Sequence, residues 1–287
     1  MIFLKIIVLA ILQGACELLP VSSSAHVIIA EKLMGINPVA PAMTLLLVML
    51  HTGTMFAVII YFRRAWKESY FKSGAAFRSF AFLVAVATFL TGTIALALKE
   101  IIEKVFLRGT PHAQVEMIFG NLGLIAISLA VVGILIIFSG RVKRGLRPAN
   151  NDIGLRESAW IGAVQALCLP FRGFSRSGAT ISTGLLAGVT RREAEEFSFA
   201  LVVVLTPPVI IREVYRLIAA HGSAPLGASG MFDLFLPSIV GMVASFLAGL
   251  MALRWLSNWL EAGRWKYFGY WCLTVAAIAL YLYHTGF

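Results

Sequence analysis

The stretch "ELLPVSSSAH" (Glu17–His26) combines a carboxylate, a proline, three consecutive serines and a histidine. It lies between "MIFLKIIVLAIL" (Met1–Leu12) and "VIIA" (Val27–Ala30), and both flanks are apolar enough to lie in a membrane. A carboxylate at the centre of a bilayer costs roughly 2–3 kcal/mol or more, so Glu17 needs a partner, a metal ion or a water-filled cavity. The stretch therefore predicts a functional site inside a membrane protein.

The rest of the chain has the composition of a membrane protein. Hydrophobic residues make up 59% of the 287 residues, charged residues make up 13%, and the mean hydropathy is +0.87. Most of the apolar runs approach the ~20 residues that span a bilayer core. They are Pro41–Phe62, Phe77–Leu98, Met117–Phe138, Phe197–Ile211, Met231–Leu253 and Phe268–Tyr283. We therefore expect an all-α polytopic membrane protein.

Two of the apolar segments need separate interpretation. Phe197–Ile211 is short for a membrane span unless its helix continues past Arg212. The first apolar stretch is not followed by a small-residue cleavage site and a soluble domain, so we interpret it as part of the fold and not as a signal peptide.

The net charge of +10 is explained by the location of the cations. Most lysine and arginine residues lie in alternate loops, at 63–78, 141–156, 191–192 and 254–266, as is typical of cytoplasmic loops. This pattern predicts that residues 99–117 and the C-terminal residue face the periplasm, and it argues against a nucleic-acid partner. The three cysteines, Cys16, Cys168 and Cys272, are too few for a disulfide framework.

An internal repeat relates the two halves of the chain. "LQGACELLPVSSSAHVIIAEKLMG" in the first half and "VQALCLPFRGFSRSGATISTGLLAG" in the second each precede a long span, with Gln and Cys three residues apart in both. Given the loop charges, the two segments would enter the membrane from opposite faces, which is an inverted-topology repeat with its functional site near the midplane. We therefore expect two inverted repeats, each with a re-entrant helical hairpin followed by transmembrane helices. The boundaries are a first repeat at 1–138, a cytoplasmic linker at 139–157 and a second repeat at 158–287, within one integral membrane domain.

The first hairpin concentrates polar side chains at helical spacing. Gln13 and Glu17 are four residues apart and share a helix face. If a helix resumes after Pro20, then Ser22 and Ser23 both flank His26. This arrangement suits acid–base or nucleophilic chemistry.

The second hairpin contains "RGFSRSGAT" (Arg172–Thr180), in which Arg176 lies between two serines. A guanidinium with hydroxyls and backbone N–H groups at a helix start suits phosphate binding. Arg172 either joins such a site or only reaches the lipid headgroups.

Together, "GACELLPVSSSAH" and "GFSRSGATIS" resemble the motifs of the bacterial undecaprenyl-diphosphate phosphatase family, also called the bacitracin-resistance phosphatase family. The segments "HTGTMFAVIIYFRR" (His51–Arg64) and "EFSFAL" (Glu196–Leu201) are also similar to family segments, so the resemblance covers nearly the full length. The chain departs from the family pattern at Arg172, where a proline is usual, at Gln13, where a second glutamate is common, and in the position of its later prolines, Pro207 and Pro208.

The resemblance implies an enzyme that hydrolyses undecaprenyl diphosphate, recycles the lipid carrier for cell-wall synthesis and confers bacitracin resistance. It implies the catalytic residues Glu17, Ser23, His26 and Arg176. The substrate-binding residues would be Gln13, Ser22, Ser24, Ser175, Ser177 and Thr180. It also implies that Glu17 holds a divalent cation, Mg²⁺ or Ca²⁺.

Several features stay open at this point. Either Ser23 or His26 could be the nucleophile. The expected location is the bacterial inner membrane, with an active site that opens toward the periplasm. The expected partners are the lipid substrate and the bilayer, and a homodimer is one oligomeric state that stays open. The alternatives are a secondary transporter or polyprenyl-lipid flippase, which would use the same inverted repeats, and a passive structural subunit, which would leave the buried polarity unexplained.

Overall fold

The computed structural model describes residues 2–35, 41–108, 114–141, 153–221 and 228–286, and these residues form helices and no strand. The helices are α1 Ile2–Leu18, α2 Ser23–Met34, α3 Pro41–Ser69, α4 Gly74–Ile101, α5 Leu122–Gly140, α6 Leu155–Leu167, α7 Arg176–Leu186, α8 Arg191–His221, α9 Ala228–Glu261 and α10 Lys266–His284. A π-helical turn, η1 Ile102–Phe106, follows α4, and a 3₁₀ turn, η2 Val115–Ile118, precedes α5. The all-helical fold expected from the sequence is confirmed.

Within the described part of the chain, five helices are long and apolar enough to cross a membrane. The segments are Leu45–Ser69, Gly74–Phe106, Leu122–Gly140, Arg191–Tyr215 and Phe235–Glu261. Helix α8 continues through Pro207 and Pro208 to His221, so the short apolar run that it contains lies in a helix of membrane-spanning length. These helices fit the prediction of a multi-pass membrane protein, although α10, which contains the expected span Phe268–Tyr283, is not among the five.

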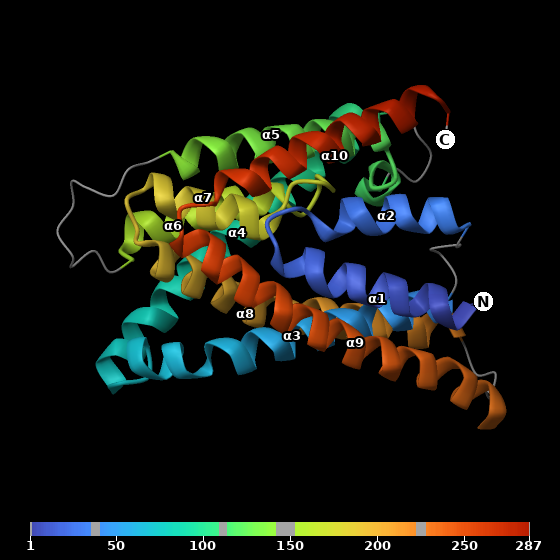
Figure 1. Ribbon diagram of the computed structural model, residues 1–287, viewed down its shortest axis with the longest axis horizontal. Helices are drawn as coiled ribbons and strands as arrows, with labels where there is room; N and C mark the ends of the chain where they lie inside the picture. The colour runs from blue at the N-terminus through green and yellow to red at the C-terminus, as the bar shows by residue number, and fades with distance from the viewer. Residues whose placement is uncertain (1, 36–40, 109–113, 142–152, 222–227, 287) are drawn as a thin grey trace.

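Two helical hairpins approach each other from opposite ends of the molecule (Figure 1). Helices α1 and α2 extend from the right-hand end in this view, and α6 and α7 extend from the left-hand end. The turns of the two hairpins contact each other, because Ser177 donates a hydrogen bond to the carbonyl oxygen of Leu19 over 3.1 Å. The hairpin turns thus bring irregular backbone and polar side chains into the middle of the helical bundle.

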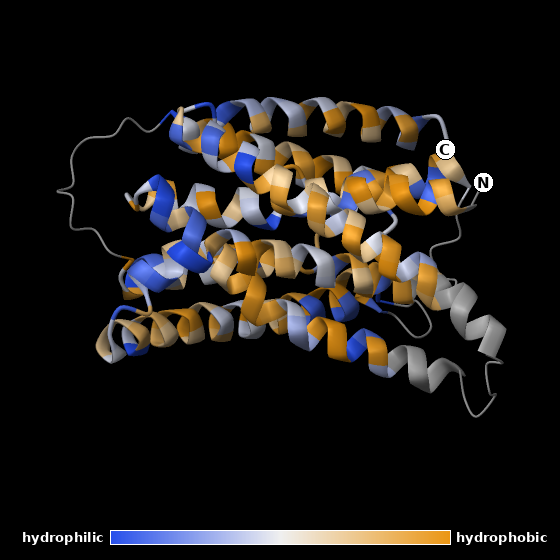
Figure 2. Cartoon of the chain, turned by 60° about the horizontal axis from the view of Figure 1, so that its bottom comes forward, coloured by the Kyte–Doolittle hydropathy of each residue, from blue (hydrophilic) through white to orange (hydrophobic). Residues whose placement is uncertain are grey.

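The basic turns gather at one end of the bundle. The α3–α4 and α9–α10 turns both lie at the left-hand end of Figure 1, whereas both termini lie at the right. Figure 2 shows hydrophobic residues along the long helices and hydrophilic residues gathered toward that same left-hand end. The exposed cations near these two turns are Arg63, Arg64, Lys67, Lys72, Arg78, Arg254 and Arg264.

The first helix of each hairpin packs against a long helix from the other half of the chain. Helix α1 packs on α9, and α6 packs on α4. Both contacts are close because a glycine faces the neighbouring backbone: a methyl group on Gly14 would overlap the carbonyl oxygen of Ser245, and one on Gly162 would overlap that of Ala87. The close packing fixes the depth at which each hairpin turn sits.

Candidate active site

Glu17, at the end of α1, is the centre of a polar cluster that joins the two hairpins. Its Oε1 lies 2.7 Å from the Arg176 guanidinium of the second hairpin. Its Oε2 accepts hydrogen bonds from the Ser23 hydroxyl over 2.5 Å and from the Gln13 amide over 3.2 Å. The Glu17 and Arg176 side chains are only 16% and 19% exposed. Three of the residues expected from the sequence, Gln13, Ser23 and Arg176, therefore meet around the carboxylate of a fourth, Glu17.

The turn after α1 directs Ser23 back toward this carboxylate. Pro20 cannot donate a backbone hydrogen bond and so helps to end the helix. Ser22 then adopts a φ of 68°, a left-handed conformation that is uncommon for a residue with a side chain, and α2 begins at Ser23. Backbone strain of this kind persists where the surrounding structure holds it in place, and it is frequent at functional sites.

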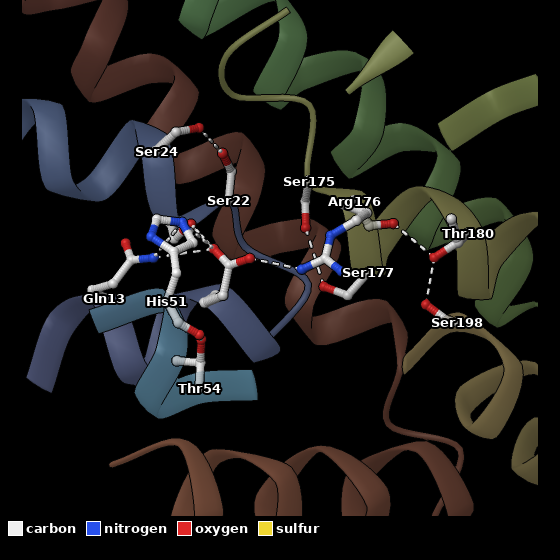
Figure 3. Close-up of polar contacts among 12 residues, drawn as sticks. Gln13, Ser22, Ser24, His51, Thr54, Ser175, Arg176, Ser177, Thr180 and Ser198 are labelled. Carbon is white, nitrogen blue, oxygen red and sulfur yellow. Dashed lines mark hydrogen bonds and ion pairs between the residues drawn. The ribbon is translucent and has the colours of Figure 1, made fainter. Parts of the chain in front are cut away.

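His51 on α3 also belongs to the cluster, and the sequence analysis gave it no role. Its Nδ1–H donates to the carbonyl oxygen of Leu47, so in the neutral ring Nε2 is free to accept. Nε2 lies 3.3 Å from the Gln13 amide nitrogen and 4.0 Å from Glu17 Oε2. Figure 3 shows Gln13 beside His51, with Arg176 on the opposite side of the view. Glu17 contacts Gln13 through Oε2 and Arg176 through Oε1, so its carboxylate connects the two sides. A histidine inside a membrane span was the available signal, because such residues are rare and usually functional.

The imidazole of His26 is held by partners other than the serine hydroxyls. Its Nδ1 lies 2.8 Å from the carbonyl oxygen of Ser22, so this nitrogen carries the proton. Its Nε2 accepts a hydrogen bond from the indole N–H of Trp271 on α10 over 3.0 Å, and the two ring planes are 7° apart. In this arrangement the Ser23 hydroxyl is directed toward Glu17 and not toward His26.

The second hairpin supplies Arg176 from the first turn of α7. Ser175 caps this helix, and its hydroxyl accepts a hydrogen bond from the backbone N–H of Gly178. The helix start places backbone N–H groups beside the guanidinium, and both favour an anion. The expected phosphate-binding segment thus has the local structure of an anion site.

The remaining serines and Thr180 connect structural elements in this structure. The Ser24 hydroxyl lies 3.2 Å from that of Ser22 and accepts from the backbone N–H of Gly173, which links the two hairpins. Thr180 donates to the carbonyl oxygen of Arg176 and lies 2.5 Å from Ser198 on α8. These groups hold the hairpin turns together and, within the described part of the chain, make no hydrogen bond to Glu17.

Among the described residues, few oxygen donors are placed to hold a divalent cation at Glu17. The described residues contain no group of three or more histidine, cysteine, aspartate or glutamate side chains that could hold a metal. Both carboxylate oxygens of Glu17 already have partners, and Gln13 adds one amide. Hard cations take six or more oxygen ligands, so this set would need most of its ligands from elsewhere.

An apolar cavity of about 650 Å³ lies away from the polar cluster, between α3, α4 and α8. Its lining includes Trp66, Phe77, Phe80 and Val203, and none of the candidate site residues contributes to it. The polar cluster itself is therefore the candidate active site.

Comparisons with known proteins find relatives along nearly the whole chain. A family model described as bacitracin resistance protein BacA matches residues 6–278. A protein named undecaprenyl-diphosphatase 2 from Acinetobacter baylyi is 56% identical over 280 residues, which cover 97% of this chain and 97% of the relative. Proteins named undecaprenyl-diphosphatase from Idiomarina loihiensis and Korarchaeum cryptofilum are 32% and 30% identical, and the matches cover 98% and 96% of this chain and 98% and 97% of the relatives. The similarity spans both hairpins.

Proposed function

The chain belongs to the bacitracin resistance protein BacA family, and we propose that it hydrolyses undecaprenyl diphosphate to undecaprenyl phosphate and inorganic phosphate. This reaction recycles a lipid carrier of cell-wall synthesis and would account for bacitracin resistance. The observation that supports it is the contact of Glu17 with both Ser23 and Arg176, which places a nucleophile, a proton acceptor and a phosphate-binding cation at one point.

Arg176 has the role of stabilising negative charge on the transferred phosphoryl group. Phosphoryl transfer depends mostly on positioning and on electrostatic stabilisation of the non-bridging oxygens. The guanidinium contacts Glu17 through one terminal nitrogen, so donors on its other nitrogens can face a phosphate. As Arg176 turns toward the phosphate, Glu17 loses part of its counter-charge and becomes a better proton acceptor.

Ser23 is the nucleophile in the proposed reaction. Its Oγ attacks the terminal phosphorus while its proton moves to Glu17, with which it already shares a 2.5 Å hydrogen bond. The bond from phosphorus to the bridging oxygen breaks, and the electron pair leaves on undecaprenyl phosphate. Glu17 then returns the proton to Oγ as water releases the phosphoryl group from Ser23.

His26 has the role of activating that water. In the tautomer set by the Ser22 carbonyl, Nε2 is an acceptor and can take a proton from water once it exchanges the Trp271 hydrogen bond for one to water. The alternative, in which His26 attacks phosphorus directly, also requires Nε2 to leave Trp271. Serine is favoured as the nucleophile because the Ser23 hydroxyl is already hydrogen-bonded to its proton acceptor, Glu17, whereas His26 Nε2 is held by Trp271.

The expected Mg²⁺ or Ca²⁺ stays a prediction. Because Glu17 and Gln13 supply too few oxygen ligands, we expect such an ion to arrive with the diphosphate and to owe most of its coordination to phosphate oxygens and water. The reaction steps assigned to Ser23, Glu17, His26 and Arg176 are independent of it.

The same proposal extends to topology. We assign the α1–α2 and α6–α7 segments as re-entrant hairpins of two inverted repeats, at 1–138 and 158–287, joined by a linker at 139–157 in one membrane domain. The matching contacts of α1 with α9 and of α6 with α4 support this assignment. The basic end of the bundle would face the cytoplasm of a bacterial inner membrane, and the site would open toward the periplasm.

Phosphate release from undecaprenyl diphosphate in detergent micelles tests the proposed function, because transport across a bilayer is impossible there. We expect the purified chain to release phosphate and Glu17→Ala to be inactive. Arg212→Gln, which alters a surface pair with Glu116, is the matched control and should remain active. No release above Glu17→Ala, with Mg²⁺ and Ca²⁺ both supplied, would exclude this function.

A further inference from the structure

Arg172 is a second arginine in the turn that carries Arg176, and the proposed reaction does not use it. Its side chain is exposed, and its guanidinium carbon lies 4.3 Å from the centroid of the Phe119 ring, just after η2. The aromatic ring covers the guanidinium and favours the positive charge. The planar donors of an arginine whose face is stacked on a ring remain available at its edges.

The backbone fixes the position of Arg172 relative to the site. The next residue, Gly173, donates its N–H to Ser24 Oγ over 3.4 Å and has a φ of 97°. A methyl group on Gly173 would lie 2.6 Å from the carbonyl oxygen of Ile125, so the turn is held between α2 and α5. Arg172 therefore lies on a rigid turn beside the polar cluster.

Among the described residues, Arg172 lacks the close ion pair that Arg176 and Arg212 each have, although Glu17, Glu116 and Glu213 lie near enough to favour its charge. Arg176 is paired with Glu17 at 2.7 Å, and Arg212 with Glu116 at 3.4 Å. Over the described ranges of the chain, Arg172 makes a cation–π contact and has no carboxylate oxygen within 4.0 Å. A ligand with two phosphate groups would bring more negative charge than Arg176 alone can balance once Glu17 is counted.

We infer that Arg172 binds the second phosphate of the substrate and thereby selects diphosphates over monophosphates. Arg176 holds the phosphoryl group that is transferred, and Arg172 holds the phosphate that stays on the lipid. This role rests on the proposed function. It gives the site a reason to release its product, because undecaprenyl phosphate has one phosphate and cannot occupy both arginines at once.

Binding of farnesyl diphosphate and farnesyl monophosphate to the full detergent-purified chain tests this inference. We expect Arg172→Gln to weaken diphosphate binding by about 10- to 100-fold, the range for lost charge-assisted hydrogen bonds, and monophosphate binding by less than about threefold. Arg172→Lys retains the charge without the planar fork and should lie between the two. Arg78→Gln, at the basic end of the bundle, is the control for a lost surface charge on the same chain and should leave both affinities unchanged.

Phe119→Leu separates the position of the guanidinium from its charge. It removes the ring under Arg172 and retains the arginine, so we expect a smaller loss of diphosphate affinity than in Arg172→Gln. Equal weakening of both ligands in Arg172→Gln would show a general structural role and overturn the inference, as would unchanged diphosphate affinity.

The two proposals fail in different ways. If the wild-type chain releases no phosphate, but Arg172→Gln removes its preference for diphosphate over monophosphate, the proposed reaction is refuted and the binding role of Arg172 is retained. A chain that hydrolyses undecaprenyl diphosphate, and whose preference for diphosphate is unaltered by Arg172→Gln and Arg172→Lys, would retain the reaction and refute the role of Arg172.

Discussion

The carboxylate of Glu17 on α1 lies 2.7 Å from the guanidinium of Arg176 on α7, although 159 residues separate them in the chain. This ion pair joins the two hairpins at the point where their turns meet. In a bilayer interior, neither charge would be tolerated without the other or a polar ligand. The pair therefore both holds the hairpins together and prepares an anion site that a phosphate can enter.

Arg176→Lys should remain strongly impaired even though it keeps the positive charge. A lysine ammonium cannot contact Glu17 and a phosphate through separate edges of one planar group, so we expect kcat/KM to fall by about 100-fold or more. Steady-state phosphate release measures this, with Arg212→Lys as the matched control. Near-normal turnover by Arg176→Lys would contradict the role assigned to the guanidinium.

His51→Ala should lower activity by about tenfold, because Gln13 loses the acceptor that orients it beside Glu17. His51→Gln, whose side-chain oxygen can accept in its place, should recover part of the loss. The two variants are compared by phosphate release at saturating substrate. If both match the wild type, His51 has no part in positioning the cluster.

Gly173→Ala should destabilise the protein by about 1–3 kcal/mol, because its φ of 97° disfavours a side chain and the methyl group would meet the Ile125 carbonyl oxygen. Gly92→Ala, in the middle of α4 with open space around it, is the control and should be neutral or slightly stabilising. Thermal unfolding in detergent measures both. A Gly173→Ala melting temperature equal to that of the wild type would mean that the turn is not rigid.

Cysteines introduced at Arg63 and Met117 should react with a membrane-impermeant reagent from opposite sides of the membrane. Both positions are exposed, and two of the native cysteines, Cys16 and Cys272, are buried and so protected. The basic turn near Arg63 is expected in the cytoplasm and Met117 in the periplasm. Labelling of both from one side would overturn the topology and the inverted repeat with it.

The sequence predicted the components of the site better than their contacts. The helical spacing of Gln13 and Glu17 placed both on one face, as the structure has them. The same reasoning paired Ser23 with His26, yet the left-handed Ser22 turns Ser23 toward Glu17 instead. The spacing of residues in the sequence cannot reveal that one of them, Ser22, has a positive φ.

Contacts between segments that are distant in the chain could not be predicted from the sequence either. Trp271 meets His26 across 245 residues, and His51 reaches Gln13 from a different helix. No periodic pattern connects these positions, because they are brought together by helix packing, which depends on the whole chain. The helices themselves were predictable, since a membrane span leaves a long apolar run in the sequence.

The identity of the phosphorylated residue tests the central claim most directly. Undecaprenyl diphosphate labelled in its terminal phosphate is mixed rapidly with the enzyme, and the reaction is stopped with acid. The account predicts an acid-stable phosphoserine that is absent in Ser23→Ala and that accumulates in His26→Ala, because His26 is needed only for its hydrolysis. An acid-labile adduct that persists in Ser23→Ala and disappears in His26→Ala would contradict the account and identify histidine as the nucleophile.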